Sequence, residues 1–151
     1  MNPQETVQAL MVSVQKGRFD EARSYLSDQF QFSGTYPEPA DAETWLGLSF
    51  SLRLAFTQLD YRFKVESAQG NVVNATMQLS GLHRGAFDLT GINRGVISAT
   101  NRNFSTVTEN NKITVKNGKV SSWEVEPNGK AGLKEILSQL GEKLPKAEKT
   151  A

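Results

Sequence analysis

The sequence predicts a single α+β domain, in which helices come first, a curved antiparallel sheet follows and a short helix closes the chain. Apolar residues recur at helical spacing in the first third and at alternating spacing from Tyr61 onward. A hairpin candidate, Gly70-Asn71, and a stronger signal, Asn117-Gly118, interrupt the alternating part. Helices and strands that are segregated along the chain are typical of the α+β class.

The N-terminal segment is expected to form two helices and a short strand. The first helix carries an apolar face formed by Val7, Leu10, Met11 and Val14 and ends at Gly17. A second short helix is expected from about Asp20 to Leu26. Phe30 and Phe32 alternate with glutamines and predict a strand, and a turn-rich loop follows from Ser33 to Pro39.

The next helix is expected to be apolar on two sides. Asp41 can cap it, because an aspartate side chain accepts hydrogen bonds from the free amides of a first helical turn. The two apolar stripes are Trp45, Leu48, Leu52, Ala55 and Phe56 on one side, and Leu46, Phe50 and Leu54 on the other. Such a helix is usually buried on both sides, so one side is expected to pack on the sheet and the other to close a cavity.

The second half of the chain alternates as half-buried strands do. Tyr61, Phe63 and Val65 share one face of the first strand. The next strand places Val73, Ala75, Met77 and Leu79 on one face, which Gly81 and His83 extend. Phe87–Arg102 is expected to be a long connection. Phe104–Lys116 is interpreted as one long strand, or as two strands if Asn110-Asn111 forms a turn.

The end of the chain is expected to form a strand, a helix and a tail. The last strand is expected from Val120 to Glu126. The closing helix carries Leu133, Ile136, Leu137 and Leu140, with Gly141 at its C-terminal end. Leu144–Ala151 is expected to be a frayed polar tail, which leaves an ordered core of about residues 3–143 within one domain, 1–151.

Composition narrows the class of protein. Lys and Arg number 17 against 16 Asp and Glu, so the sequence has no basic excess of the kind that nucleic-acid binding requires. No cysteine is present, which excludes disulfides, thiolate metal sites and cysteine nucleophiles. We expect a cytoplasmic protein that binds no membrane, because the sequence shows neither a signal peptide nor an apolar span of about 20 residues.

Three groups of residues resemble motifs of one family. Gly81-Leu-His-Arg-Gly-Ala-Phe87 is similar to Gly-Thr-His-x-Gly-x-Phe, and Asn117-Gly-Lys-Val120 with Trp123 is similar to Asp-Gly-Lys-Ile followed by tryptophan. Gly132-Leu133 with Gln139-Leu-Gly141 is similar to a closing Gly-Leu and Gln-Leu-Gly. Together, in this order, they resemble the SnoaL-like polyketide cyclase group of the nuclear transport factor 2-like superfamily, over roughly Val7–Gly141.

The resemblance implies an α+β cone with a deep pocket, a homodimer formed through the sheet, and chemistry that needs no metal or cofactor. Cyclases of this group use an aspartate near the end of the last strand as general acid and base. That position falls on Asn128 here, and an amide exchanges no proton near neutral pH. Glu126 and Glu124 are the alternative acidic residues.

Two other residues are candidates for proton transfer. His83, the only histidine, either lines the pocket or is a structural residue bonded to the backbone at a strand end. Glu109 either faces the apolar interior, which would raise the pKa of its carboxyl, or lies in a solvated turn with Asn110 and Asn111. The turn is the favoured interpretation.

We therefore expect the protein to bind a small apolar or ring-containing molecule in a central pocket. The catalytic candidates are His83, Glu109 and Asn128. The ligand-binding candidates are Tyr36, Trp45, Phe50, Tyr61, Met77 and Trp123. The first hypothesis is a binding protein whose acid/base site is degenerate, because of Asn128. The alternative is a cofactor-independent cyclase, isomerase or hydratase-like enzyme.

Overall fold

The computed structural model describes residues 1–147. The helices in this part are α1 (Pro3–Gln15), α2 (Phe19–Ser24), α3 (Ala42–Ala55) and α4 (Gly132–Gln139), with a 3-10 turn, η1 (Thr90–Ile92). The strands are β1 (Leu26–Ser33), β2 (Ala40–Asp41), β3 (Phe56–Asp60), β4 (Lys64–Gln69), β5 (Val72–Met77), β6 (Ser80–His83), β7 (Phe87–Asp88), β8 (Val96–Ile97), β9 (Asn103–Ser105), β10 (Glu109–Lys116) and β11 (Lys119–Val125).

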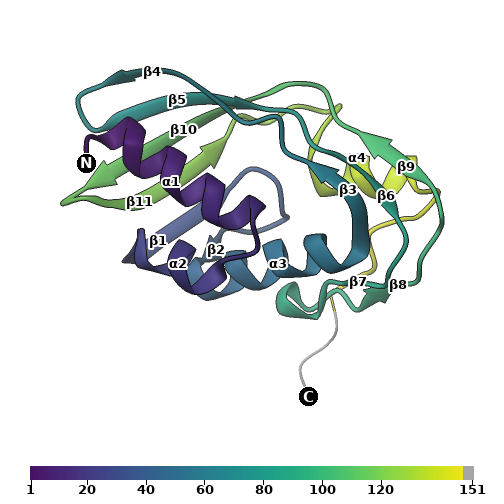
Figure 1. Cartoon of the computed structure of the whole chain (residues 1–151). Coiled ribbons are helices and arrows are strands. Elements are labelled where there is room, and N and C mark those ends of the chain that lie inside the picture. Colours follow the sequence, from purple (N-terminus) through teal and green to yellow (C-terminus); the bar gives the residue numbers. More distant parts are fainter. Residues whose placement is uncertain (148–151) are drawn as a thin grey trace.

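The strands form one curved sheet surface built from two main sheets. The larger sheet has the order β2-β1-β11-β10-β5-β4 and the smaller the order β3-β6-β9, with β7 and β8 paired beside them. The chain passes from β5 into β6 and from β9 into β10, and Leu79 and Thr106 join these two crossings by hydrogen bonds of 2.8 and 3.0 Å. The sheets therefore continue into each other around a bend, as Figure 1 shows.

The N-terminal helices cover the hollow side of the bent sheet (Figure 1). Helix α1 contacts β4, β5, β10 and β11, and α3 contacts β1, β2, β3 and β7. Helix α1 begins with a capping box between Asn2 and Glu5. The expected cap of α3 is confirmed, because the Asp41 carboxylate accepts from the Thr44 amide at 2.8 Å.

Several sequence predictions are confirmed. Asn117 and Gly118 both have positive φ, at 52° and 75°, and join β10 to β11. Gly70 joins β4 to β5 with a φ of 58°. The predicted face of β5 and β6 is buried throughout, from Val73 to His83. Gly141, with a φ of 77°, follows α4 as a C-terminal glycine should.

Other predictions were wrong in detail. The sheet is mixed, because β1 runs parallel to β11 and the other pairs are antiparallel. The strand expected from Tyr61 is preceded by the unpredicted β3, and Arg62, with a φ of 39°, separates β3 from β4. The second stripe of α3 is not buried beyond Leu46: Phe50 and Leu54 are 48% and 63% exposed.

The expected long strand, Phe104–Lys116, is broken, but the break does not lie at Asn110-Asn111, where a turn was favoured. The break falls at residues 106–108, where Thr106 turns to bond Leu79, and Asn110-Asn111 lies within β10. The connection from Phe87 to Arg102 contains the hairpin of β7 and β8. Leu144 packs against the core, and Arg94 donates to the Pro145 carbonyl at 3.1 Å, so this part of the expected tail is held; residues 148–151 lie outside the described residues.

Candidate functional site

Glu109 is the first residue of β10, and its side chain is turned into the domain. It pairs with Met77 of β5, and both residues are buried, at 4% and 7% exposure. Alternation along β10 places Asn111, Ile113 and Val115 on the same buried face. The interpretation of Glu109 as a turn residue was therefore wrong, and the alternative, an inward carboxyl among apolar residues, describes its position.

Burial changes the acidity of this carboxyl. No hydrogen bond or ion pair from residues 1–147 reaches the Glu109 carboxylate, whose own side chain packs inside an apolar face. Desolvation raises the pKa of Glu109 from 4.5 to about 7, because the charged form loses water without gaining a partner. Both protonation states are consequently populated near neutral pH.

A buried hydrogen-bond chain lies beside Glu109. The Trp123 indole Nε1 donates to Asn111 Oδ1 at 2.7 Å, and Asn111 Nδ2 donates to the Glu109 carbonyl at 3.1 Å. Asn111 and Trp123 are 2% and 1% exposed. These two hydrogen bonds satisfy polar atoms of two buried side chains, and they fix the ring of Trp123 relative to the backbone of Glu109.

Aromatic rings fill the space between α3 and the sheet. Trp45 of α3 stacks on Phe32 at 5.5 Å and packs on Trp123 at 5.6 Å. Phe63 reaches Trp123 from the other side at 5.6 Å. Trp45, Trp123 and Met77, three of the predicted ligand-binding residues, are thus brought into the same interior as Glu109.

Two tyrosines form the boundary between this interior and the surface. Tyr61 is buried, Tyr36 is partly buried, and Tyr36 packs on Phe32 at 6.0 Å. Burial raises the pKa of both phenols, the charge that Tyr61 would carry raises the pKa of Tyr36 further, and the positive charge of Arg53 lowers the pKa of Tyr61 in part. Both hydroxyls stay protonated at physiological pH and can serve as hydrogen-bond donors.

Two surface cavities lie outside the two tyrosines. The first, the loop groove, has a volume of about 410 Å³ and is lined by Gly34–Pro37, Pro127–Gly129, Ala131–Lys134 and Leu144. The second, the β3 cavity, has a volume of about 680 Å³ and is lined by Val14, Gln15, Arg53 and residues 56–61. Tyr36 lines the loop groove and Tyr61 the β3 cavity. Neither cavity is lined by Glu109, Trp45, Met77 or Trp123, so neither is the central pocket expected from the sequence, and aromatic side chains fill the space between α3 and the sheet.

Asn128 lies apart from Glu109, on the surface. It is exposed, and its side chain accepts from the Lys130 amide at 2.9 Å in the loop before α4. It shares the loop groove with Tyr36. The alternatives Glu124 and Glu126 are exposed too, and Glu126 accepts from the Asn110 side chain at 3.1 Å. None of the three therefore supplies a buried acid or base.

His83 is fully buried in a different part of the molecule. Its ring lies 5.0 Å from that of Phe56, and its Nδ1 accepts from the Thr100 amide at 3.2 Å and lies 2.9 Å from the Thr100 hydroxyl. Met77 pairs with Glu109, and His83 follows Met77 by six residues. Six residues of extended backbone span up to about 20 Å, which separates His83 from Met77 and its partner Glu109. These contacts agree with the interpretation of His83 as a structural residue that is bonded to the backbone.

The environment of His83 leads to a prediction about acid stability. Burial lowers the pKa of His83 below 6.5, so the folded protein favours the neutral ring. The resulting stability is fully present above pH 6.5 and is lost as pH falls through the lowered folded pKa. We expect His83→Gln, which keeps an acceptor but cannot titrate, to lose less stability than the wild type between pH 7 and pH 5 in urea unfolding. Parallel losses in the two proteins would contradict this assignment.

Phe50 does not join the interior. It lies 48% exposed on the outer side of α3, where its ring packs edge-on against Phe19 at 5.8 Å. Two other residues near the site were missed by sequence reasoning. Asn111 was placed with Glu109 either on one strand face or in a turn, but its hydrogen bond with Trp123 was not predicted. Arg53 gave no signal, because an arginine on a helix is ordinarily solvated.

No group of acidic or histidine side chains in residues 1–147 is arranged to hold a metal ion. Across the same residues, no helix has the length and apolar character needed to cross a membrane.

Comparison with known proteins identifies the fold. No protein-family model matches the chain, and no curated protein matches it. Among solved structures, a nuclear transport factor 2-like protein from Burkholderia thailandensis is similar over 94% of this chain and 98% of its own, with 12% identity and a TM-score of 0.68. A candidate SnoaL-like polyketide cyclase from Jannaschia is similar over 82% and 83%, with 20% identity and a TM-score of 0.62.

A third structure, from Catenulispora acidiphila, has a ketosteroid isomerase-like fold and contains trimethylamine. It covers 94% of this chain and 95% of its own, with 14% identity and a TM-score of 0.62. These similarities show that the chain has the nuclear transport factor 2-like fold, as its motifs predicted. SnoaL-like proteins are among its structural neighbours.

Proposed function

We propose that this protein binds a small apolar, ring-containing molecule and that Glu109 transfers a proton to or from it in a reaction without a cofactor. The observation that carries the proposal is a buried, unpartnered carboxyl whose pKa is about 7. A general acid or base works best when its pKa lies near the working pH. Strongly perturbed carboxyls in apolar surroundings are concentrated at functional sites.

The surroundings of Glu109 suit a flat apolar substrate. Met77, which pairs with Glu109, and Trp123, which is linked to it through Asn111, supply apolar surface, and Tyr36 and Tyr61 supply neutral hydroxyl donors further out, at the two cavities. A carboxylate that removes a proton next to a carbonyl leaves negative charge on the carbonyl oxygen, and neutral donors in a dry site stabilise that charge. Ring closure and isomerisation both proceed through such a step. Dimerisation through the sheet remains a prediction.

The second candidate function is binding without turnover. Asn128 favours it, because the position at which the resemblance places an aspartate holds an amide that faces solvent. Under this alternative, Glu109 would be a hydrogen-bonding partner of a ligand and no reaction would follow. The two candidates share the ligand class and differ only in proton transfer.

One experiment separates the candidates. A ring ketone with acidic α-protons, 2-tetralone, is incubated with the protein in D₂O, and exchange at the α-carbon is followed by NMR. We expect the wild type to accelerate exchange and Glu109→Gln to lose about 100-fold of that rate. Glu126→Gln, which removes an exposed carboxylate, should retain it. An equal rate in Glu109→Gln and the wild type would contradict proton transfer by Glu109, and binding without exchange would support the second candidate.

A further inference from the structure

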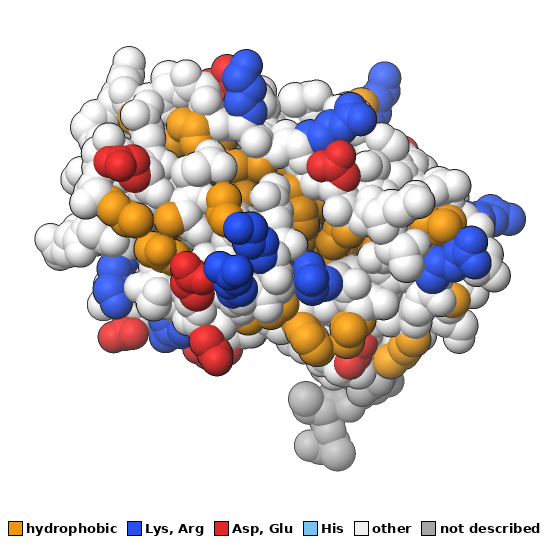
Figure 2. All heavy atoms as spheres, viewed as in Figure 1, with side chains coloured by type: hydrophobic (Ala, Val, Ile, Leu, Met, Phe, Trp, Pro, Cys, Tyr) orange, Lys and Arg blue, Asp and Glu red, His pale blue; other side chains and the backbone are white. Residues whose placement is uncertain are grey.

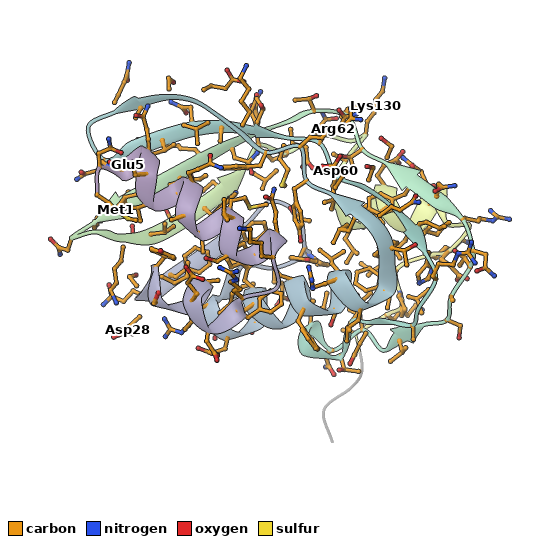
Figure 3. The ribbon with its side chains drawn as sticks, in the orientation of Figure 1. Met1, Glu5, Asp28, Asp60, Arg62 and Lys130 are labelled. Atoms are coloured by element: carbon orange, nitrogen blue, oxygen red, sulfur yellow. The ribbon has the colours of Figure 1, made fainter. Side chains whose placement is uncertain are left out.

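The β3 cavity carries one unpaired positive charge. Its only charged lining residues are Arg53 and Asp60. Asp60 is paired with Arg62 at the surface, since its carboxylate lies 3.5 Å from the Arg62 guanidinium and accepts from the Arg62 amide at 3.0 Å. Figure 3 shows Asp60 and Arg62 near each other at the end of β3. Arg53, in contrast, forms no ion pair with any residue of 1–147.

The guanidinium of Arg53 is held in place by the end of α1. Its Nη1 donates to the Gln15 carbonyl at 2.9 Å. The side chain crosses Gly17 so closely that an added Cβ there would lie 2.6 Å from Arg53 Nε. One hydrogen bond leaves the other N–H groups of the guanidinium without a partner in the described residues. A fixed guanidinium with free donors suits a carboxylate, which accepts two parallel hydrogen bonds.

Tyr61 connects the wall of the β3 cavity to the strand pair that holds Glu109. Its carbonyl accepts from the Gln78 amide at 3.0 Å. The residue before Gln78 is Met77, which pairs with Glu109. Since neighbouring strands lie about 4.8 Å apart, the backbones of Tyr61 and Glu109 are separated by roughly 10 Å. That is comparable with the length of a two- or three-ring molecule.

We infer that the β3 cavity is a binding site for the carboxylate of a ring-containing organic acid, with Arg53 as its anchor. The cavity wall includes the partly exposed Leu59 and the edges of the buried Val14 and Phe56 beside the cation. The inference rests on the proposed function, because it adds an acidic group to the proposed ligand: the carboxylate binds Arg53 at the surface, and the buried Tyr61 would have to move for the rings to reach Glu109. On the face shown in Figure 2, charges of both signs are scattered. We therefore attribute the preference for a carboxylate to Arg53 and not to a basic patch.

The test compares two isosteric probes, 2-naphthoate and 2-naphthamide, by calorimetric titration. We expect the wild type to bind the carboxylate about 10-fold more tightly than the amide, as a charge-assisted hydrogen bond requires. Arg53→Gln should abolish this preference and leave the affinity for the amide unchanged. Arg53→Lys should retain part of it, and Arg84→Gln, which removes an exposed arginine that does not line the cavity, should retain all of it. Thermal melts establish that each variant is folded.

Each outcome decides the inference. Equal affinity for the two probes in the wild type, or a preference that survives in Arg53→Gln, overturns the assignment of Arg53. In either case binding of the neutral amide still supports the proposed function, so the two failures are distinguishable. Failure of both probes to bind the wild type counts against the inference and against the ligand class proposed above.

Discussion

The variant Glu109→Gln is expected to gain stability relative to the wild type as pH rises. In the unfolded chain the carboxyl ionises near 4.5, and in the folded protein near 7. Between these values the folded state binds more protons, so the stability that the protonated group contributes is fully present below pH 4.5 and is lost as pH rises through 7. The shift from 4.5 to about 7 corresponds to roughly 3 kcal/mol. Glutamine cannot ionise and escapes this loss.

The measurement is urea unfolding of the wild type and Glu109→Gln at pH 4 and pH 9. The difference in unfolding free energy between the two proteins should change by about 3 kcal/mol in favour of the variant from the lower pH to the higher. Any cost of burying the amide appears at both values and cancels. Glu126→Gln is the matched control, because its carboxylate is exposed and should show no such change. A pH-independent difference for Glu109→Gln would refute the buried-carboxyl assignment.

Breaking the bond between Trp123 and Asn111 is expected to have the second large effect. Asn111→Leu leaves the buried Trp123 Nε1–H without an acceptor, which costs about 2 kcal/mol of unfolding free energy. Trp123→Phe leaves Asn111 Oδ1 without its donor and creates a small cavity, for a similar cost.

A double-mutant cycle separates the hydrogen bond from packing. Asn111→Leu with Trp123→Phe removes both polar partners, so its loss should be smaller than the sum of the two single losses. The pair Val73→Ala and Leu133→Ala serves as a control for buried residues on separate elements, β5 and α4, and its effects should add. Additive losses at Asn111 and Trp123 would mean that the contact contributes little.

Much of the fold could be predicted because its signals are local. Alternation placed Val73–His83 on one buried face, and the left-handed preference of Asn117-Gly118 marked the β10–β11 hairpin. The cap at Asp41 depends on residues three apart. Each of these features is determined by neighbours in the chain, which is where sequence patterns carry most information.

The features that were missed depend on tertiary contacts. Asn110-Asn111 has turn composition, yet pairing with β5 and β11 holds it extended, and this places Glu109 inside. Strand β3 follows α3 without a turn signal and exists because β6 pairs with it. The outer stripe of α3 stays exposed because α2 covers Phe50 only in part, through Phe19. Arg53 acquires its role only from its contacts with α1 and β3.

The ionisation of Glu109 is the property on which the proposed chemistry depends, and NMR can measure it directly. The carboxyl carbon of selectively ¹³C-labelled glutamate would be titrated, with Glu109→Gln identifying the signal. We predict a midpoint near pH 7 for this signal. A midpoint near 4.5 would show a solvated carboxylate and would contradict both the buried position and the proton-transfer role of Glu109.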